Sequence, residues 1–372
     1  MSRSYRIAQM AGDGIGPEVV AEARKVVEAV ASAKGFGLSW VDYPFGAEHY
    51  LKTGEILPES VLDELQSCQA LLLGAIGDPR VKAGILERGI LLKLRFFFDM
   101  FVNLRPAKAF PRVPLPVPLP EGREMDLLVV RENTEDFYVG LGGDGGSPVD
   151  LGLERGLYTM EGEMRVRFST PQRSAFQVGL ATEGAVRRIT ADACERALGR
   201  GEKRLTLATK ANAMPQLYGF WEEMARDETE KRGLTFETIN VDALCYHLVR
   251  TPWKWNVVLC PNMFGDIVSD LLAALSGGLG VAAGANIGAG LGMFEPVHGS
   301  APDIARQNRA NPLAAILSAA LMLDCLGEKE AARSVEAAVG AFLAGARPDE
   351  LPEEMGGRGT TSAVGDAVAS HL

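Results

Sequence analysis

Four short, almost wholly apolar runs place the strongest limit on how this chain can fold. They are "ALLLGAIG" (70–77), "DLLVV" (126–130), "LTLAT" (205–209) and "NVVLC" (256–260). Apolar runs of this length, without polar alternation, are typical of strands buried on both faces, as in parallel sheets. Segments with helical spacing of apolar residues lie between them. The chain is therefore predicted to have an α/β fold.

The N-terminal segment "YRIAQMAGDG" is predicted to form a strand that runs into a glycine turn. A helix is expected to begin at Pro17 and end at Gly35. The stretch "AGDGIGPE" is close to the dinucleotide pattern G-x-G-x-x-G, but Pro17 stands where the last glycine is needed. Because Asp42 lies near the place of a ribose-binding acid, these residues leave a Rossmann-type site open.

Length and composition indicate a globular protein of about two domains. The 372 residues are 47% hydrophobic and 23% charged, which allows a large core. A net charge of −10 argues against nucleic acid as the main partner. Five scattered cysteines without a C-x-x-C pair are typical of reduced thiols inside a cell. With no signal-peptide pattern, the cytoplasm is the expected compartment.

Three further segments stand outside this alternation of buried strands and helices. The longest uncharged stretch, 271–294, contains seven glycines, so we expect a helix end, turns and a loop there and no membrane span. The proline-rich segment 110–122 is predicted to be an extended surface crossover. The segment "GLYTMEGEMRVRFST" (156–170) is predicted to form a β-hairpin arm around a glycine turn.

Polar residues follow three of the apolar runs. Arg131 follows "LLVV", Lys210 follows "LTLAT", and Asn262 comes shortly after "NVVLC", just before Asp266 and Asp270. Ligands of open α/β sheets bind at the carboxyl ends of the strands. These side chains are therefore expected along one edge of the sheet.

Three aspartates could form a metal site. Asp266 and Asp270 are four residues apart in "NMFGDIVSDLLA", on one face of a predicted helix, and Asp242 lies early in another helical pattern. An all-oxygen site suits Mg²⁺ or Mn²⁺ better than zinc. The alternative is that Asp242 is only a charge at a helix N-terminus and that the other two face solvent.

Three arginines and two side chains that could exchange protons precede the aspartates in the sequence. Arg95, Arg105 and Arg131 have few local acidic partners and could bind a small di- or tricarboxylate through their planar forks. Tyr138 and Lys210, near arginines and a cation, are expected to have a pKa below the usual value of about 10. The alternatives are surface arginines and a packed tyrosine.

The segment "FEPVHGSAPDIARQNRANP" (294–312) is predicted to be a rigid polar loop. It carries Glu295, His298, Asp303 and Asn311 among glycine, proline and small residues. Such a loop could hold a nucleotide, although an ordinary structured loop has the same composition.

Several of these motifs together resemble the isocitrate/isopropylmalate dehydrogenase family, the β-decarboxylating dehydrogenases. The matching stretches, in order, are "GDGIGPE", "NLRPAK", "VVRENTEDFY", "TKANAM", "NMFGDIVSDL" and "FEPVHGSAPDI" with "ANP". The resemblance covers residues 5 to about 365. It implies two α/β domains with a cleft between them, not a Rossmann fold, which accounts for Pro17.

The resemblance also implies how the chain is divided and assembled. Residues 1–104 and 277–372 would form a nucleotide-binding domain. Residues 105–276 would form the dimerisation and metal/substrate domain, with an arm at about 141–175. The protein would be a homodimer whose active sites are shared between subunits.

The same resemblance assigns roles to individual residues. The substrate's carboxylates and its γ-group would be bound by Arg95, Arg105, Arg131, Leu91 and Leu92. Mg²⁺ or Mn²⁺ would be held by Asp266 and Asp270 of one subunit and Asp242 of the other. Proton transfer would involve Tyr138, the partner's Lys210 and Asp242. NAD⁺ would be bound by Asn212, Glu295, His298, Gly299, Asp303, Ile304 and Asn311.

The implied reaction is oxidation of a 2-hydroxy acid followed by loss of its β-carboxylate. Leu91 and Leu92 indicate an apolar γ-group and favour 3-isopropylmalate, whose oxidation to 2-oxoisocaproate belongs to leucine biosynthesis. Ala213 and the segment 91–106 are also similar to tartrate and D-malate dehydrogenases, and "RENTED" to isocitrate and homoisocitrate enzymes. A non-catalytic relative is the remaining alternative. Asp303 favours NAD⁺ over NADP⁺.

Overall fold

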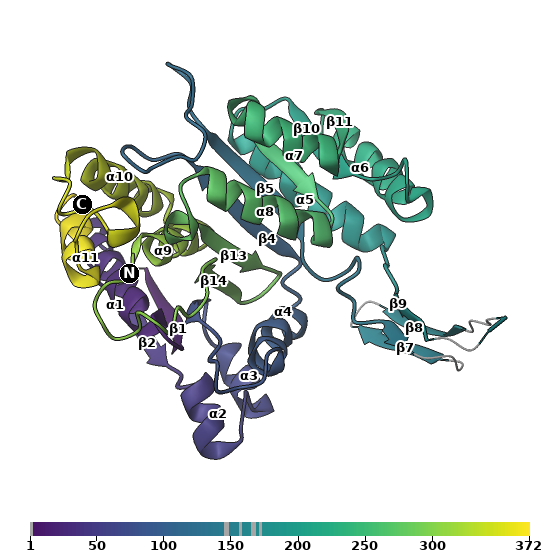
Figure 1. Cartoon of the computed structure of the whole chain (residues 1–372), viewed down its shortest axis with the longest axis horizontal. Helices are drawn as coiled ribbons and strands as arrows, with labels where there is room; N and C mark the ends of the chain where they lie inside the picture. Colours follow the sequence, from purple (N-terminus) through teal and green to yellow (C-terminus); the bar gives the residue numbers. More distant parts are fainter. Residues whose placement is uncertain (1–2, 145–148, 156–157, 165–168, 171–172) are drawn as a thin grey trace. The chain divides into compact units, whose positions relative to one another are not determined.

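The computed structural model describes residues 3–144, 149–155, 158–164, 169–170 and 173–372 (Figure 1). The chain divides into two compact units. Unit 1 comprises Met1–Val129, His247–Asn256 and Val268–Leu372, and unit 2 comprises Val130–Tyr246 and Val257–Ile267. These bounds differ from the predicted ones. The predicted roles of the two domains in nucleotide binding and dimerisation stay predictions.

Unit 1 is built on a mixed sheet. In spatial order its strands are β4 (Val102–Lys108), β13 (Ala283–Ile287), β14 (Gly292–Pro296), β3 (Ala70–Ala75), β1 (Ser4–Gly12) and β2 (Gly37–Asp42). Strands β14, β3, β1 and β2 pair in parallel, whereas β13 is antiparallel to both neighbours. The apolar run at 70–77 is confirmed as a buried parallel strand.

The expectation of a helix end, turns and a loop at 271–294 is wrong in part. Strands β13 and β14 lie within or overlap it, and nearly all of their residues are buried. Glycine and alanine have weak strand preference, so the sequence carries no strand signal there. Pairing with β4 and β3 forms these strands, since a buried backbone needs hydrogen-bond partners.

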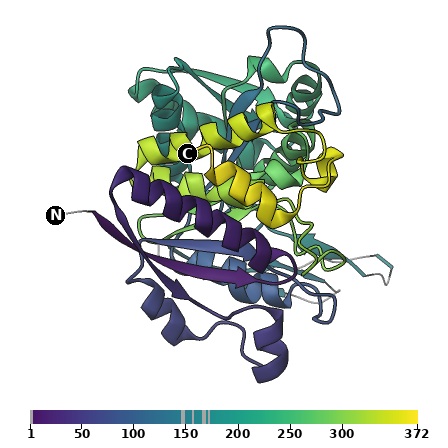
Figure 2. The same cartoon turned by 90° about the vertical axis from the view of Figure 1, so that its left-hand side faces the viewer.

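Helices cover both faces of the unit 1 sheet. The helix α1 (Gly16–Lys34) has Pro17 at its start and Gly35 in a left-handed cap at φ 74°, as predicted. It packs with α9 (Leu313–Cys325) and α11 (Thr361–Ala369), as Figure 2 shows. The other face packs against α2 (Ala47–Thr53), α3 (Glu59–Leu65), the π-helical turn η1 (Glu87–Leu92) and α4 (Lys93–Phe97). The remaining helix is α10 (Lys329–Gly345).

Unit 2 contains the parallel strands β10 (Arg204–Thr209), β11 (Thr235–Asn240) and β12 (Val257–Cys260). Its helices are α5 (Glu183–Gly199), α6 (Phe220–Lys231) and α7 (Val241–Arg250). Strand β5 (Asp126–Glu132) and helices α7 and α8 (Asn262–Leu275) each run from one unit into the other. The apolar runs at 126–130, 205–209 and 256–260 are therefore confirmed as strands.

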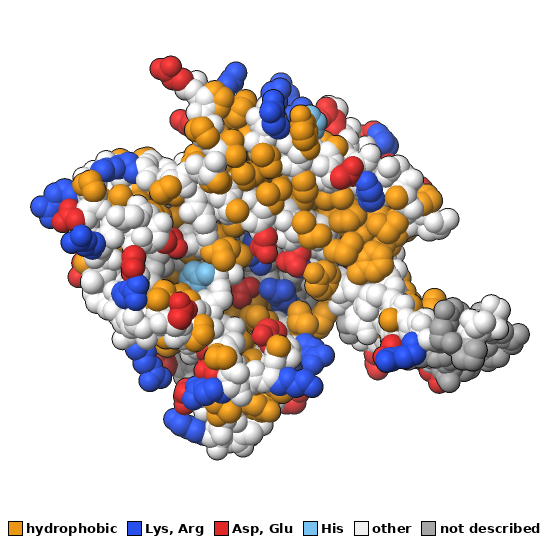
Figure 3. Space-filling view, viewed as in Figure 1, with side chains coloured by type: hydrophobic (Ala, Val, Ile, Leu, Met, Phe, Trp, Pro, Cys, Tyr) orange, Lys and Arg blue, Asp and Glu red, His pale blue; other side chains and the backbone are white. Residues whose placement is uncertain are grey.

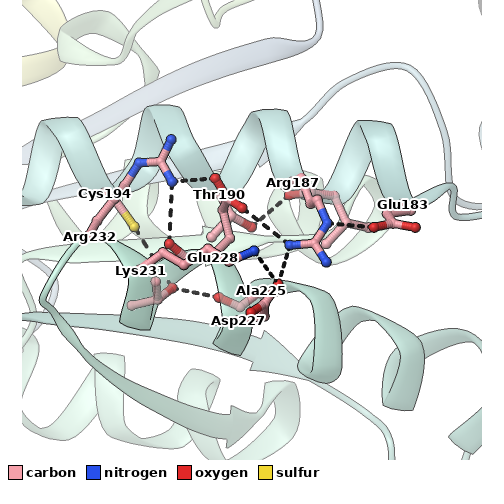
Figure 4. Close-up of polar contacts among 11 residues, drawn as sticks. Glu183, Arg187, Thr190, Cys194, Ala225, Asp227, Glu228, Lys231 and Arg232 are labelled. Carbon is pink, nitrogen blue, oxygen red and sulfur yellow. Dashed lines mark hydrogen bonds and ion pairs between the residues drawn. The ribbon is translucent and has the colours of Figure 1, made fainter.

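A network of charged side chains joins α5 to α6 (Figure 4). Arg187 of α5 donates to Glu183 one turn earlier at 2.7 Å, and to Asp227 and Glu228 of α6. Lys231 also contacts Asp227, at 2.7 Å. Each of the three acids in this network therefore has a basic partner.

Two antiparallel strand pairs follow β5 in unit 2. They are β7 (Val149–Arg155) with β8 (Tyr158–Met164), and β6 (Gly142–Asp144) with β9 (Ala175–Gln177). The prediction of a hairpin within 156–170 is wrong in its pairing, because Gly162 lies inside β8 opposite Leu151 and the partner of β8 is the preceding segment 149–155. The part of the predicted arm at 145–148, 156–157, 165–168 and 171–172 lies outside the described residues.

The proline-rich segment 110–122 has no helix or strand and is mostly exposed, as predicted. Among the helices that the structure describes, none is long and apolar enough to cross a membrane.

Candidate active site

The parallel strands of unit 2 bring several predicted residues to one edge. Lys210 directly follows β10, Asp242 is the second residue of α7 after β11, and Asn262 begins α8 after β12. Because β10 pairs in parallel with both β11 and β12, their carboxyl ends lie together. The predicted placement at this edge is confirmed for Lys210 and Asn262, and Asp242, which the edge prediction did not include, lies there as well. Arg131 differs slightly, since it lies inside β5 and not beyond its end.

Asp266 is held by two other predicted site residues. Its Oδ1 accepts a hydrogen bond from Nη1 of Arg131 at 2.6 Å, and its Oδ2 accepts one from the Tyr138 hydroxyl at 2.8 Å. The buried Arg131 also donates through Nε to the backbone oxygen of Asn262 at 2.9 Å. Its guanidinium lies 5.6 Å from the centre of the Tyr138 ring. The expectation of few local acidic partners for Arg131 concerns its neighbours in the sequence, whereas the fold gives it an acidic partner 135 residues away.

The expected lowering of the Tyr138 pKa is not produced by the side chains of this chain. Burial and the hydrogen bond to Asp266 raise the pKa of the Tyr138 hydroxyl, and the positive charge of Arg131 opposes them. A phenolate beside a carboxylate is disfavoured because both are negative. Any lowering would need a bound cation.

Lys210 and Asp242 form an ion pair at the same edge. The hydrogen bond from Lys210 lowers the pKa of the exposed Asp242 carboxyl. Two of the three residues predicted to take part in proton transfer, Lys210 and Asp242, are thus in direct contact within one chain. Asn212 is exposed in the turn after β10.

The three aspartates do not converge within the described part of one chain. No group of three or more histidine, cysteine or carboxylate side chains among the described residues could hold a metal ion. Asp266 is half-buried and Asp270 is exposed one turn further along α8. Carboxylate oxygens alone form a donor set that suits Mg²⁺ or Mn²⁺, so these residues fit such an ion chemically.

A buried polar segment links β5 to this edge, and the sequence reasoning did not assign it a role. Its members, all at most 7% exposed, are Glu132, Asn133, Thr134, Glu135 and Asp136. Burial raises the pKa of Glu132 to about 7, although Thr134 and Glu135 donate hydrogen bonds to its carboxylate. The sequence does contain a signal for this buried polar segment, because "RENTED" places six polar residues directly after a buried apolar run.

In unit 1, hydrogen bonds connect the other two predicted substrate arginines. Arg95 of α4 donates to Oε1 of Glu295 at 3.1 Å, and Asn286 donates to the same oxygen at 2.8 Å. Asn103 donates to Asn286 at 2.9 Å and accepts from Nε of Arg105 at 2.8 Å. One expectation is corrected here, because Glu295 is buried in strand β14 instead of lying in a loop. The acidic partner of Arg95 is 200 residues away in the sequence.

Leu91 and Leu92 lie at the end of the π-helical turn η1 and are half-buried. Leu91 packs against the apolar core between the sheet and α3. It therefore has a packing role whether or not it also contacts a substrate.

The predicted nucleotide loop is shaped by residues outside it. The carboxylate of Glu18 accepts hydrogen bonds from the backbone N–H groups of Arg306 and Asn308, both at 2.7 Å. Those two residues have left-handed backbones at φ 61° and 57°, which are unfavourable without such support. The loop exposes the Asp303 carboxylate, followed by the half-buried Ile304.

Several polar atoms of this loop are already paired and one is not. Nδ1 of His298 lies 3.0 Å from the backbone oxygen of Gly299, and burial lowers the pKa of the imidazole. Its buried Nε2 has no hydrogen-bond partner among the described residues, which fits a ligand-facing role. Arg309 is held by both oxygens of Glu353 at 2.7 Å, and Asn311 donates to Glu354 at 2.6 Å.

Comparison with known proteins identifies the family. The model for "Isocitrate/isopropylmalate dehydrogenase" matches residues 6–368. The 3-isopropylmalate dehydrogenase of Mycobacterium bovis is 44% identical over 372 residues, covering 99% of this chain and all of that protein. The enzyme of the same name from Thermobifida fusca is 40% identical and covers 100% of this chain and 98% of its own.

A solved structure agrees. The isocitrate dehydrogenase of Methylococcus capsulatus has a TM-score of 0.82 at 31% identity and covers 99% of both chains. The chain belongs to the isocitrate/isopropylmalate dehydrogenase family. The predicted fold and the predicted class, an oxidoreductase of the β-decarboxylating dehydrogenases, are confirmed.

Proposed function

We propose that this protein catalyses the NAD⁺- and divalent-metal-dependent oxidative decarboxylation of 3-isopropylmalate to 2-oxoisocaproate, a step of leucine biosynthesis. The observation that carries this proposal is full-length identity of 40–44% to relatives named 3-isopropylmalate dehydrogenase. Those names do not favour the tartrate and D-malate alternative. The apolar pair Leu91 and Leu92 supports a substrate with an apolar γ-group.

Substrate binding would depend on charge and on an apolar contact. Arg95, Arg105 and Arg131 would bind the two carboxylates of the substrate, since guanidinium groups bind carboxylates bidentately. Leu91 and Leu92 would contact the isopropyl group. The acidic partners of Arg95 and Arg131 in this structure, Glu295 and Asp266, would orient the two guanidinium groups.

Asp266 and Asp270 would hold Mg²⁺ or Mn²⁺, with Asp242 of a second copy of the chain. When bound, the metal supplies Lewis-acid stabilisation of the substrate oxygens. The pair of Asp242 with Lys210 keeps that carboxyl ionised, because the hydrogen bond lowers its pKa. An ionised carboxylate is the form that can act as a ligand.

NAD⁺ would be bound by the loop that carries His298, Gly299, Asp303 and Ile304, with Asn311, Glu295 and Asn212. Bound NAD⁺ accepts a hydride from the substrate. The exposed Asp303 carboxylate could accept hydrogen bonds from ribose hydroxyls, and it would repel a 2′-phosphate. The unpartnered Nε2 of His298 could bind the adenine base.

Proton transfer would involve three residues. The proton of the 2-hydroxyl would pass to the Asp242 carboxylate, or to Lys210 once its ammonium group has given up its own proton, as the substrate is oxidised. Tyr138 would donate a proton to carbon after CO₂ leaves. Its raised pKa fits a proton donor, because the hydroxyl keeps its hydrogen at neutral pH until it is needed.

Exposed apolar side chains support a homodimer. Tyr246 of α7 is 61% exposed and Ile267 of α8 is 56% exposed, and both belong to unit 2. Figure 3 shows hydrophobic side chains gathered over the region of these two helices. A second copy that covers this surface would bring its own Asp242, which lies on α7, toward Asp266, which lies on α8.

A substrate panel tests the proposal. We expect NADH formation with 3-isopropylmalate, NAD⁺ and Mn²⁺ to exceed that with D-malate, tartrate, isocitrate or homoisocitrate by at least about tenfold in kcat/KM. Loss of activity after chelation, and its return with Mn²⁺, would support the metal. Preference for tartrate or D-malate would overturn the substrate assignment.

A further inference from the structure

The N-terminus of α8 is held by a carboxylate from a distant part of unit 2. Oδ2 of Asp136 accepts a hydrogen bond from the backbone N–H of Met263 at 2.8 Å. The first N–H groups of a helix have no partner inside the helix. A carboxylate there satisfies one of them and is also favoured by the positive end of the helix dipole.

Asp136 is itself tightly constrained. It is 1% exposed, and its backbone pairs with Leu180 through hydrogen bonds of 2.8 and 3.3 Å. Its φ of 63° lies in the left-handed region, which residues other than glycine seldom adopt. Its second carboxylate oxygen accepts a hydrogen bond from the buried Tyr218 hydroxyl at 3.2 Å. A residue so constrained can serve as a fixed point for α8.

The same loop meets α8 a second time, at the proposed catalytic residues. Tyr138 is two residues after Asp136, and its hydroxyl donates to Asp266, three residues after Met263. The loop therefore contacts α8 at two places, through Asp136 at Met263 and through Tyr138 at Asp266, about one helical turn apart. If the first contact is lost, the helix can shift and the 2.8 Å contact of Tyr138 with Asp266 need not persist.

We propose that Asp136 is a positioning residue that, by holding the backbone of Met263, sets the placement of Asp266 and of the metal-binding turn of α8 relative to Tyr138. This inference rests on the proposed function, because it concerns the same reaction. Asp136 does not itself contact the substrate in this scheme. It acts through Asp266 and Tyr138.

The neighbouring residue provides a matched control. Glu135 is also a buried carboxylate, but its two oxygens accept from the backbone N–H and the hydroxyl of Thr182, at 2.7 and 2.8 Å. Thr182 is the N-cap of α5. Glu135 therefore holds the N-cap residue of α5, whose hydroxyl oxygen itself accepts from the N–H of Ala185 at 3.3 Å, whereas Asp136 accepts directly from a backbone N–H of α8.

Three variants test the inference. Asp136→Gly removes the carboxylate without penalising the left-handed backbone, since glycine adopts positive φ freely. Asp136→Asn keeps an oxygen for the Met263 N–H and an amide group that can donate to the Tyr218 hydroxyl. Glu135→Ala is the control. Each is measured for kcat, for KM of NAD⁺, for Mn²⁺ affinity, and for amide hydrogen exchange at residues 263–266.

We expect Asp136→Gly to lower kcat by about 10- to 100-fold, because misplacement of about 1 Å can cost that much. Mn²⁺ binding should weaken, exchange at residues 263–266 should accelerate, and KM for NAD⁺ should stay within about twofold. Asp136→Asn should recover most of kcat. Glu135→Ala should destabilise the protein but keep kcat within about threefold.

Equal losses of kcat in Asp136→Gly and Glu135→Ala would overturn the inference, as would unchanged exchange at 263–266. If Asp136→Gly does not fold, full Mn²⁺ affinity and full kcat in Asp136→Asn, together with faster exchange at 263–266, would also overturn it. If the proposed function is wrong, the wild-type protein itself will not oxidise 3-isopropylmalate. This result differs from a failure of the inference about Asp136, in which the wild type is active.

Discussion

The hydroxyl of Tyr138 lies 2.8 Å from Oδ2 of Asp266, whose other oxygen lies 2.6 Å from Nη1 of Arg131. One carboxylate thus joins a proposed proton donor and a proposed substrate-binding arginine. The same carboxylate is a proposed metal ligand. Changes at Asp266 should therefore affect binding of the metal and of the substrate together.

Asp266→Asn should abolish activity and weaken Mn²⁺ binding. One anionic ligand is lost, and the buried Arg131 loses its charged partner. We expect at least about a 100-fold loss in kcat/KM, measured by NADH formation, with Mn²⁺ affinity measured by titration. Asp192→Asn is a matched control, because Asp192 pairs with Arg196 in α5, away from this edge. Wild-type turnover of Asp266→Asn in chelator-treated buffer would remove Asp266 from the metal site.

Sharing of the active site between subunits predicts complementation. Lys210→Ala and Asp266→Asn should each be inactive alone, because each removes one part of the site. Mixed dimers should regain activity, since some of them contain one site with both residues intact. The measurement is NADH formation by purified heterodimers carrying two different tags. Inactive heterodimers would show that each site is built from one chain.

Leu91→Ser should weaken 3-isopropylmalate selectively. Losing the apolar contact with one or two methyl groups costs about 1–3 kcal/mol, or roughly 10- to 100-fold in kcat/KM. D-Malate has no group there and should be little affected. The ratio of the two substrates is an internal control for lost packing, because Leu91 also contacts the core. A parallel fall for both substrates would argue for a packing role alone.

Asp303→Lys should narrow or invert the preference for NAD⁺. In the wild type we expect NAD⁺ to exceed NADP⁺ by at least about tenfold in kcat/KM, which needs only about 1.4 kcal/mol. Arg309 could in principle contact a 2′-phosphate, but Glu353 holds it with two hydrogen bonds. Glu353→Ala is therefore expected to raise NADP⁺ use modestly. Equal use of both cofactors by the wild type would contradict the role of Asp303.

Glu132→Gln should change how stability depends on pH. Burial raises the pKa of Glu132 from 4.5 to about 7, so the folded state binds the proton more tightly than the unfolded state. Its stabilising contribution is complete below about pH 4.5 and is lost as pH rises through about 7.

The Gln variant cannot lose that proton. Relative to the wild type, its free energy of unfolding should therefore rise between pH 5 and pH 8, by on the order of 1–3 kcal/mol. Urea unfolding of both proteins at the two pH values measures this difference. A constant difference would mean that Glu132 does not titrate in this range.

Local features of the sequence were enough to predict much of this protein. The buried strand at 70–75 follows from its apolar run, and the bounds of α1 follow from Pro17 and Gly35. The family follows from several long motifs in order. Each of these signals is contained in a short stretch of sequence, or in several such stretches taken together. Detecting them does not require knowing which distant residues are in contact.

The partners of the charged residues were decided only by the tertiary structure. Arg131 and Asp266 are 135 residues apart, Arg95 and Glu295 are 200 apart, and both pairs form because strands and helices distant in sequence pack together. The strands β13 and β14 depend on the same effect, since glycine-rich segments become strands only when neighbouring strands supply hydrogen bonds. The hold of Asp136 on α8 is another long-range contact, across 127 residues. Sequence patterns show which residues are available, whereas the packing of the chain determines which of them meet.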